Sequence, residues 1–168
     1  NNCLLINDFY NSDLGSLAIA LDLMNQHGKE RKKTVILSDI FQSGFQPEDL
    51  YTQVSELLIL NEIDKIVGIG DDIASQAKSF QCESIFYPTT ETFLKSIDTN
   101  LFKNEIILIR GARDFRFERI SSALQYKSHR TILEVNLTAM VHNLNYFRSL
   151  LQPKTKLMVM VKAFSYGS

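Results

Sequence analysis

The chain has 168 residues, of which 45% are hydrophobic and 22% are charged, and its formal net charge is −1. This composition is typical of a soluble globular protein large enough for a full domain. The absence of a basic excess argues against nucleic acid as a partner. Apolar runs all fall short of the roughly 20 residues that span a bilayer, so no membrane partner is expected. Two cysteines, Cys3 and Cys82, make no disulfide framework and favour the cytoplasm.

The N-terminus has no initiator Met and no basic signal-peptide start. Residues 3–8 instead have the pattern of a strand. We therefore expect the chain to be a piece of a longer protein.

Short apolar runs alternate with amphipathic stretches over about the first 125 residues. The runs predict five strands, at residues 3–8, 34–38, 65–69, 84–87 and 105–109. The second and fifth runs are apolar throughout, which is typical of strands buried on both faces of a parallel sheet. Strand–helix alternation of this kind predicts an α/β fold, a Rossmann-like and mostly parallel sheet flanked by helices.

Two helices between these strands have a clear apolar stripe. The first carries Leu17, Leu21 and Met24 at helical spacing, and Gly28 is a plausible stop. The second begins near Pro47. Its acidic first turn suits a helix N-terminus, and its predicted core face comprises Leu50, Val54, Leu57 and Leu58.

A polar segment, residues 126–130, separates this region from a second patterned one. We assign residues 1–127 to one domain, 128–130 to a linker, and 131–168 to the start of another. The second part predicts a strand at 131–135, a helix from about 137 to 151 capped by Asn136 or Thr138, and a final strand that runs into Lys162. The stripe of that helix comprises Met140, Leu144, Phe147 and Leu151.

The turn after the first strand carries Asp8, and a carboxylate at the carboxyl end of a parallel strand suits a ligand with hydroxyl groups, such as ribose. The alternative is simple capping, with Ser12 or Asp13 as the helix N-cap and Asp8 as a turn former. The glycines at 68 and 70 favour an ordinary strand-to-helix turn over a phosphate-binding loop. The three histidines lack metal-ligand spacing, and no metal site is predicted.

The stretch from Asn7 to Leu17 resembles the opening of the C-terminal domain of the Mur ligases, most closely the type that adds D-alanyl-D-alanine to a UDP-muramoyl tripeptide. Asp8, Tyr10 and Asn11 fit the pattern of that family, whereas residues 12–14 depart from it. The resemblance implies that Asp8 lies near the ribose of ATP. It implies that Tyr10 and Asn11 line the nucleotide cleft.

Two more stretches resemble the same family. Residues 37–40, followed by Gly44, resemble its Gly-Asp-Met turn, in which Asp39 is as much a structural as a catalytic candidate. Residues 108–113 resemble its Lys-Gly-Ser-Arg turn, with Arg110 in place of Lys. Because an arginine binds a carboxylate with two hydrogen bonds, Arg113 is the first candidate for the dipeptide carboxyl group and Arg110 the second. The alternative is a solvated basic helix face formed by the arginines at 110, 113, 116 and 119.

Residues 131–168 resemble the N-terminus of the alanine racemases. The matching features are the run 132–137, the helix with His142-Asn143-Leu144, and the strand that ends at Lys162 with Tyr166-Gly167 behind it. The resemblance implies that Lys162 is catalytic and forms an imine with pyridoxal phosphate, and that Tyr166 contacts the cofactor phosphate. The alternative for Lys162 is an exposed lysine after an edge strand. Phe164, Ser165 and Ser168 depart from the family pattern.

The order of the two resemblances is similar to a fused enzyme of peptidoglycan precursor synthesis. It implies an ATP- and Mg-dependent ligase, which phosphorylates the tripeptide carboxyl group before the dipeptide amine attacks. It also implies a racemase of alanine that requires pyridoxal phosphate and is a homodimer in the intact protein. We expect the fragment alone to catalyse neither reaction. The alternatives are a stand-alone flavodoxin-like or receiver-like binding domain, or a non-catalytic scaffold.

Overall fold

The computed structural model describes residues 2–9, 13–28, 30–41, 43–97, 102–125 and 136–160. The chain divides into two compact units, Asn1–Tyr126 and Lys127–Ser168. Each unit is described here by itself.

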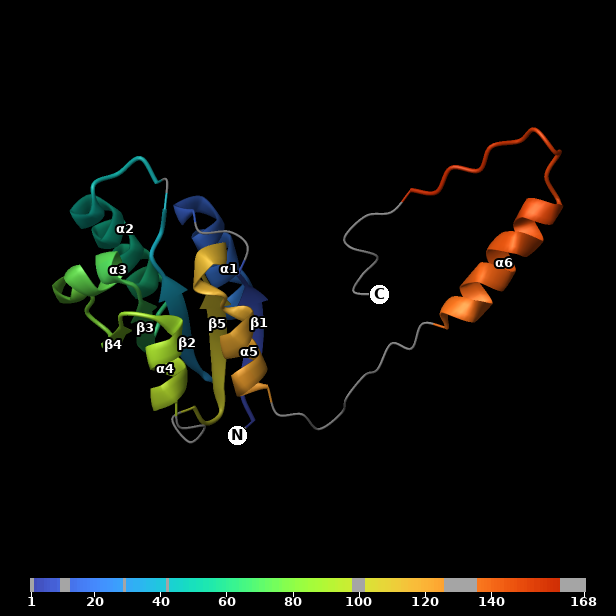
Figure 1. Cartoon of the computed structure of the whole chain (residues 1–168). Helices are drawn as coiled ribbons and strands as arrows, with labels where there is room; N and C mark the ends of the chain where they lie inside the picture. The colour runs from blue at the N-terminus through green and yellow to red at the C-terminus, as the bar shows by residue number, and fades with distance from the viewer. Residues whose placement is uncertain are drawn as a thin grey trace. The chain divides into compact units, whose positions relative to one another are not determined.

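The first unit is built on one sheet of five parallel strands (Figure 1). The strands are β1 (Leu4–Asp8), β2 (Lys32–Ser38), β3 (Lys65–Ile69), β4 (Glu83–Tyr87) and β5 (Glu105–Arg110). Their order in the sheet is β1-β5-β2-β3-β4, so the last strand lies between the first two. The predicted parallel α/β sheet is confirmed, and each strand lies within two residues of its predicted bounds.

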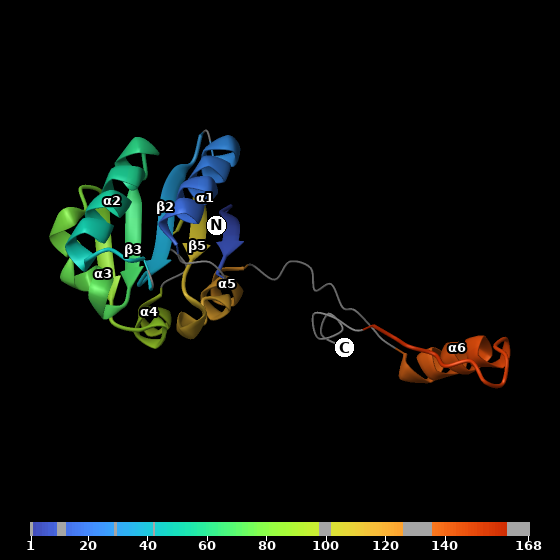
Figure 2. The same ribbon diagram turned by 90° about the horizontal axis from the view of Figure 1, so that it is seen from above.

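Helices cover both faces of this sheet (Figure 2). The helices α1 (Leu14–His27), α2 (Pro47–Leu60) and α3 (Asp71–Ser75) pack on one face, followed by the short 3-10 helix η1 (Ala77–Ser79). The helices α4 (Thr90–Ser96) and α5 (Glu118–Leu124) pack on the other face, with the 3-10 helix η3 (Arg113–Phe115) before α5. The connections from β1 to β2, β3 and β4 run in one direction along the sheet and place their helices on one face. The connection from β4 back to β5 runs in the opposite direction and places α4 on the other face, as right-handed crossovers require.

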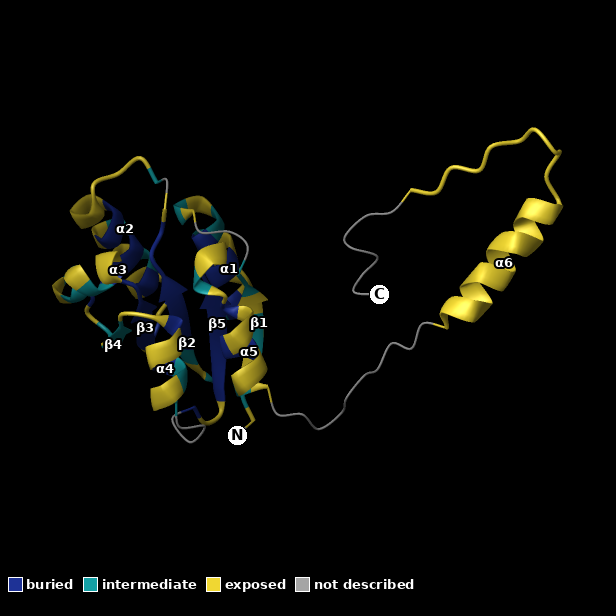
Figure 3. Ribbon diagram, viewed as in Figure 1, coloured by how far each residue is buried: buried dark blue, intermediate teal, exposed yellow. Residues whose placement is uncertain are grey.

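The core forms two layers, one on each side of the sheet, and the strands β2, β3 and β5 are the most buried part of the unit (Figure 3). The predicted stripe of α1, comprising Leu17, Leu21 and Met24, is fully buried. The predicted face of α2 is buried at Leu50, Val54 and Leu58 and partly buried at Leu57. Pro47 opens α2 and Gly28 ends α1, as their positions in the sequence predict.

Three strands extend beyond their predicted bounds because they gain partners across the sheet. β2 begins at Lys32, which pairs with Glu105, and β5 continues to Arg110, which pairs with Asp8. β4 begins one residue early at Glu83, which pairs with Lys65. Hydrogen bonding to a neighbouring strand therefore adds polar residues that a hydrophobicity pattern leaves out.

The described part of the second unit contains one helix, α6 (Leu137–Ser149). Asn136 caps it by accepting a hydrogen bond from the amide of Ala139 at 2.9 Å, so one of the two predicted caps is correct. All residues from 136 to 160 are exposed, including the predicted stripe. The four stripe side chains, Met140, Leu144, Phe147 and Leu151, have relative exposures of 38–60%.

The predicted strand that leads to Lys162 is wrong for its described part. Residues 156–160 adopt no regular secondary structure. A β-strand needs a neighbour to satisfy its backbone groups, and no strand pairing is found for these residues within the described range. The predicted strand at 131–135 lies outside the described residues.

Candidate functional site

The strand order brings polar and charged side chains together at the carboxyl ends of β1, β5 and β2. The chain leaves β1 and β2 toward helices on one face, whereas it leaves β5 toward a helix on the opposite face. Connections that diverge in this way open a crevice at the carboxyl edge, where open α/β sheets bind ligands. We therefore take this edge as the candidate site.

Asp8 and Arg110 form an ion pair at the centre of this edge. They are register partners at the ends of β1 and β5, and Nη1 of Arg110 donates to Oδ2 of Asp8. The arginine side chain is fully buried, whereas the aspartate side chain is 29% exposed. The pair therefore presents a carboxylate, and not a cation, to the crevice.

Arg110 also binds the first turn of α1. Its Nη2 donates to the carbonyl oxygen of Asp13 at 3.1 Å and to the hydroxyl group of Ser16. The Asp13 carboxylate lies 3.8 Å from Nη2 and caps α1 by accepting from the amide of Ser16 at 2.8 Å. Of the two predicted N-caps, Ser12 and Asp13, the structure thus confirms Asp13.

Burial and neighbouring charges shift the pKa values of Asp13 and Arg110 in opposite directions. The hydrogen bonds from Ser16 lower the pKa of Asp13, and the charge of Arg110 lowers it further. Burial lowers the pKa of Arg110, while the charges of Asp8 and Asp13 raise it. Asp13 therefore remains an anion at neutral pH, which suits its place at a helix N-terminus.

Asp39 lies one strand further along and serves the fold. Its buried carboxylate accepts from the amide of Ile73 at 2.8 Å and from that of Asp72 at 3.4 Å, in the first turn of α3. The hydroxyl group of Tyr51 lies 3.5 Å from the same group. Burial raises the pKa of Asp39 above its ordinary value. These contacts assign a structural role to this carboxylate.

A pocket of about 430 Å³ opens between the loops that follow β2, β4 and β5. Phe41 and Phe115 stack at 6.0 Å between ring centroids and line the pocket together with Pro88. Glu91, Asp114 and Arg116 add charges of both signs to the lining. The pocket is thus amphipathic, with apolar rings beside charged groups.

Arg113 begins η3 directly after the β5 turn and is exposed. Arg116 and Arg119 are also exposed, and Arg119 pairs with Glu91. Arg110 alone among these four arginines is fully buried. The predicted basic face therefore does not include Arg110, since its guanidinium group points into the fold.

The structure brings two predicted site residues, Asp8 and Arg110, into direct contact. Tyr10, Asn11, Lys162 and Tyr166 lie outside the described residues. Sequence reasoning missed Ser16 as an arginine ligand. The signal that could have indicated it is a single arginine at the end of a fully apolar strand, since such a cation must find internal partners.

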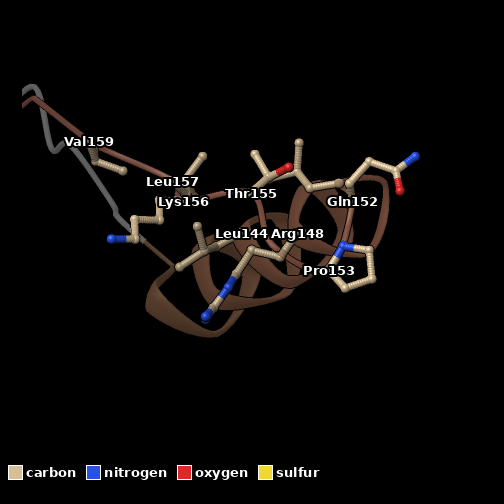
Figure 4. Close-up of a pocket in the computed structure, with 9 residues that line it drawn as sticks. Leu144, Arg148, Gln152, Pro153, Thr155, Lys156, Leu157 and Val159 are labelled. Atoms are coloured by element: carbon tan, nitrogen blue, oxygen red, sulfur yellow. The ribbon is translucent and has the colours of Figure 1, made fainter.

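A larger pocket, of about 710 Å³, lies within the second unit (Figure 4). It is formed by one end of α6 and the segment that follows, which includes Leu144, Arg148, Pro153 and Lys156. The side chains of Arg148 and Lys156 carry its positive charge.

Across the described ranges, no group of three or more His, Cys, Asp or Glu side chains could hold a metal ion. Over the same ranges, no helix has the length and apolarity that crossing a membrane demands.

Comparisons with known proteins give four informative matches, although no family model matches the sequence. The chain is 26% identical over 121 residues to the UDP-N-acetylmuramoyl-tripeptide–D-alanyl-D-alanine ligase of Bacillus subtilis, covering 69% of this chain. It is 28% identical over 127 residues to the ligase of the same name from Borreliella burgdorferi, covering 71% of this chain. The match spans 26% of each of these ligases, so the chain corresponds to about a quarter of their length.

Two solved structures share the fold. Crystal structure I of MurF from Acinetobacter baumannii matches 71% of this chain and 27% of its own, with a TM-score of 0.58 and 20% identity. A murein peptide ligase from Psychrobacter arcticus matches 79% of this chain and 29% of its own, with a TM-score of 0.53 and 16% identity. The two sequence matches support homology between this chain and the C-terminal domain region of the D-alanyl-D-alanine-adding Mur ligases, and the two solved structures show that the fold is shared.

Proposed function

We propose that residues 1–127 are the C-terminal domain of an ATP- and Mg-dependent cytoplasmic ligase that adds D-alanyl-D-alanine to UDP-N-acetylmuramoyl-tripeptide. The observation that carries this proposal is the sequence match with two ligases of that name over more than 120 residues. The carboxyl edge of the sheet supports the proposal, since the partly exposed carboxylate of Asp8 follows β1 and the exposed Arg113 follows β5.

ATP fits the residues present at this edge. Asp8 is ionically paired and partly exposed, so its carboxylate can accept hydrogen bonds from ribose hydroxyl groups. In the proposal, Tyr10 and Asn11 complete the nucleotide side of the crevice, and Arg113 binds the carboxyl group of the dipeptide. Arg113 suits this role because it is exposed and directly follows the β5 turn.

The test uses the longer reading frame that contains this chain. The purified protein is expected to release phosphate from ATP only when both the UDP-linked tripeptide and D-alanyl-D-alanine are present. Arg113→Gln is expected to raise the KM for the dipeptide about tenfold or more and leave the KM for ATP unchanged, because a lost carboxylate–arginine pair is worth more than 1 kcal/mol. Dipeptide-independent ATP hydrolysis would contradict the proposal.

We further propose that residues 131–168 begin an alanine racemase domain, which is homodimeric in the intact protein. The sequence resemblance supports this, and so does the exposed apolar stripe of α6, because a barrel helix would bury such a stripe against the rest of its domain. Pyridoxal phosphate would supply the electron sink for exchange of the alanine α-proton. Its proposed ligands, Lys162 and Tyr166, lie outside the described residues.

Borohydride reduction of the longer protein tests this second part. Peptide mapping is expected to find the reduced cofactor on Lys162, and Lys162→Ala is expected to abolish both labelling and racemisation. Lys156→Ala is the matched control, since it removes a nearby lysine from the same segment. Labelling that is unchanged in Lys162→Ala would refute the assignment. The 168-residue chain by itself is expected to catalyse neither reaction.

A further inference from the structure

Arg110 joins the two ends of the loop that connects β1 to α1. On the strand side it binds Asp8, and on the helix side it binds the carbonyl oxygen of Asp13 and the hydroxyl group of Ser16. This loop carries the residues that the proposed function assigns to the nucleotide. A single buried side chain thus fixes both anchor points of the loop.

The energetics of this arrangement do not favour Arg110 as a contribution to stability. A buried ion pair roughly balances its own desolvation and can often be replaced by apolar residues without loss. Nε of Arg110 is buried and has no hydrogen-bond partner among the described residues, and burying an unsatisfied donor is unfavourable. A cation beside the N-terminus of α1 also opposes the helix dipole.

The geometry is equally unfavourable for a direct role in binding a substrate carboxylate. The Arg110 side chain is fully buried, and both of its terminal nitrogens already have partners. The partly exposed member of the pair is Asp8, at the carboxyl end of β1. The orientation of Asp8 is therefore what the buried arginine controls.

We propose that Arg110 is a positioning residue, which ties the end of β1 to the first turn of α1 and thereby orients Asp8 to receive a ligand with vicinal hydroxyl groups. This inference rests on the proposed function, in which that ligand is the ribose of ATP. Arg110 then acts through Asp8 and touches neither the nucleotide nor the dipeptide.

Steady-state kinetics of the longer protein test the proposal. Arg110→Met is expected to raise the KM for ATP about tenfold and leave the KM for D-alanyl-D-alanine unchanged. Combining it with Asp8→Asn is expected to add little to the effect of Asp8→Asn alone, because the two residues act as one unit. Arg110→Lys keeps the charge without the fork and is expected to restore part of the affinity. Lys32→Met is the control, since it breaks an exposed ion pair with Glu83 that takes no part in the crevice.

Hydrogen exchange in the 168-residue chain provides a measurement that does not depend on ligase activity. The amides of Ser16 and Leu17 bond to Asp13 and are expected to exchange about tenfold faster in Arg110→Met. The amides of Ile36 and Ile107, in the central strands, are expected to keep their wild-type rates.

Three results would overturn the proposal. An unchanged KM for ATP would remove the link to Asp8, and a raised KM for the dipeptide alone would assign Arg110 to the substrate carboxylate. Uniformly faster amide exchange across the sheet in Arg110→Met would show that Arg110 only stabilises the fold. If the wild-type longer protein has no ATP-dependent turnover, the proposed function fails, and the exchange rates of the Ser16 and Leu17 amides still decide whether Arg110 holds the first turn of α1.

Discussion

Gly70 and Asp39 depend on each other at the carboxyl ends of β3 and β2. Gly70 has φ +136°, and a Cβ built there would overlap the Asp39 carboxyl group. The close approach lets Asp39 reach the amides at the start of α3. Only glycine allows this contact, because it adopts such a φ without strain and has no side chain to collide.

Replacing Gly70 by alanine is therefore expected to lower the free energy of unfolding by at least about 2 kcal/mol. Gly44→Ala is the matched control. Gly44 also has positive φ, +75°, but a Cβ there would meet nothing within 4 Å, so about 1 kcal/mol of backbone strain is expected. Urea denaturation of both variants measures the difference. Equal losses of unfolding free energy in the two variants would show that the close contact with Asp39 does not contribute to the effect of Gly70→Ala.

The raised pKa of Asp39 makes the stability of the fold depend on pH in a specific direction. A carboxyl group whose folded pKa lies above its unfolded value stabilises the fold in its protonated form. That contribution is present below the unfolded value of 3.8 and is lost as the pH rises through the folded pKa. Asp39→Asn removes the titration, so the stability of the wild type relative to this variant is expected to fall as the pH rises above 3.8. Thermal unfolding of both proteins across this range checks the sign, and a constant difference would contradict it.

At the scale of elements, the start of α1 carries more interactions than its sequence pattern indicates. Its apolar stripe explains the packing of the helix, and Asp13 explains its first residue. The same carboxylate also balances the buried charge of Arg110. The N-terminus of α1 is therefore joined to the end of β5.

Asp13→Ala is expected to destabilise the protein by about 1 kcal/mol at neutral pH, the usual effect of losing an N-cap. Because hydrogen bonds from Ser16 lower the pKa of Asp13, its contribution is present above the unfolded value of 3.8 and is lost as the pH falls through the folded pKa. The difference from wild type should thus shrink in acid. Asp22→Ala, in the middle of the same helix, is the control and is expected to have little effect. Urea titrations at neutral and acid pH measure both variants.

At the scale of the whole molecule, both core layers are built from residues of the first unit. Among the described residues, Leu124 is the last that packs against either layer. A chain that ends after Gln125 is therefore expected to fold by itself and to unfold in one cooperative transition. Calorimetry measures this transition, for which the calorimetric and van't Hoff enthalpies are expected to agree. A broad or absent transition would refute this expectation.

The sequence predicted the fold well where each element carries its own pattern. The apolar runs of β2 and β5 indicated a buried parallel sheet, and the stripes of α1 and α2 predicted which residues enter the core. The strand toward Lys162 was predicted wrongly over residues 156–160, because its apolar residues specify burial but not a neighbour with which to pair.

By itself, the sequence determined the class of the fold, the bounds of the strands to within two residues, two candidates for each of two helix caps, and a resemblance to Mur ligases that the comparisons support. Only the tertiary structure decided that β5 lies between β1 and β2. That order places Arg110 against Asp8, 102 positions away, and turns the arginine into the fold. Local patterns report how each segment interacts with water, whereas the partner of a buried charge depends on which strands become neighbours.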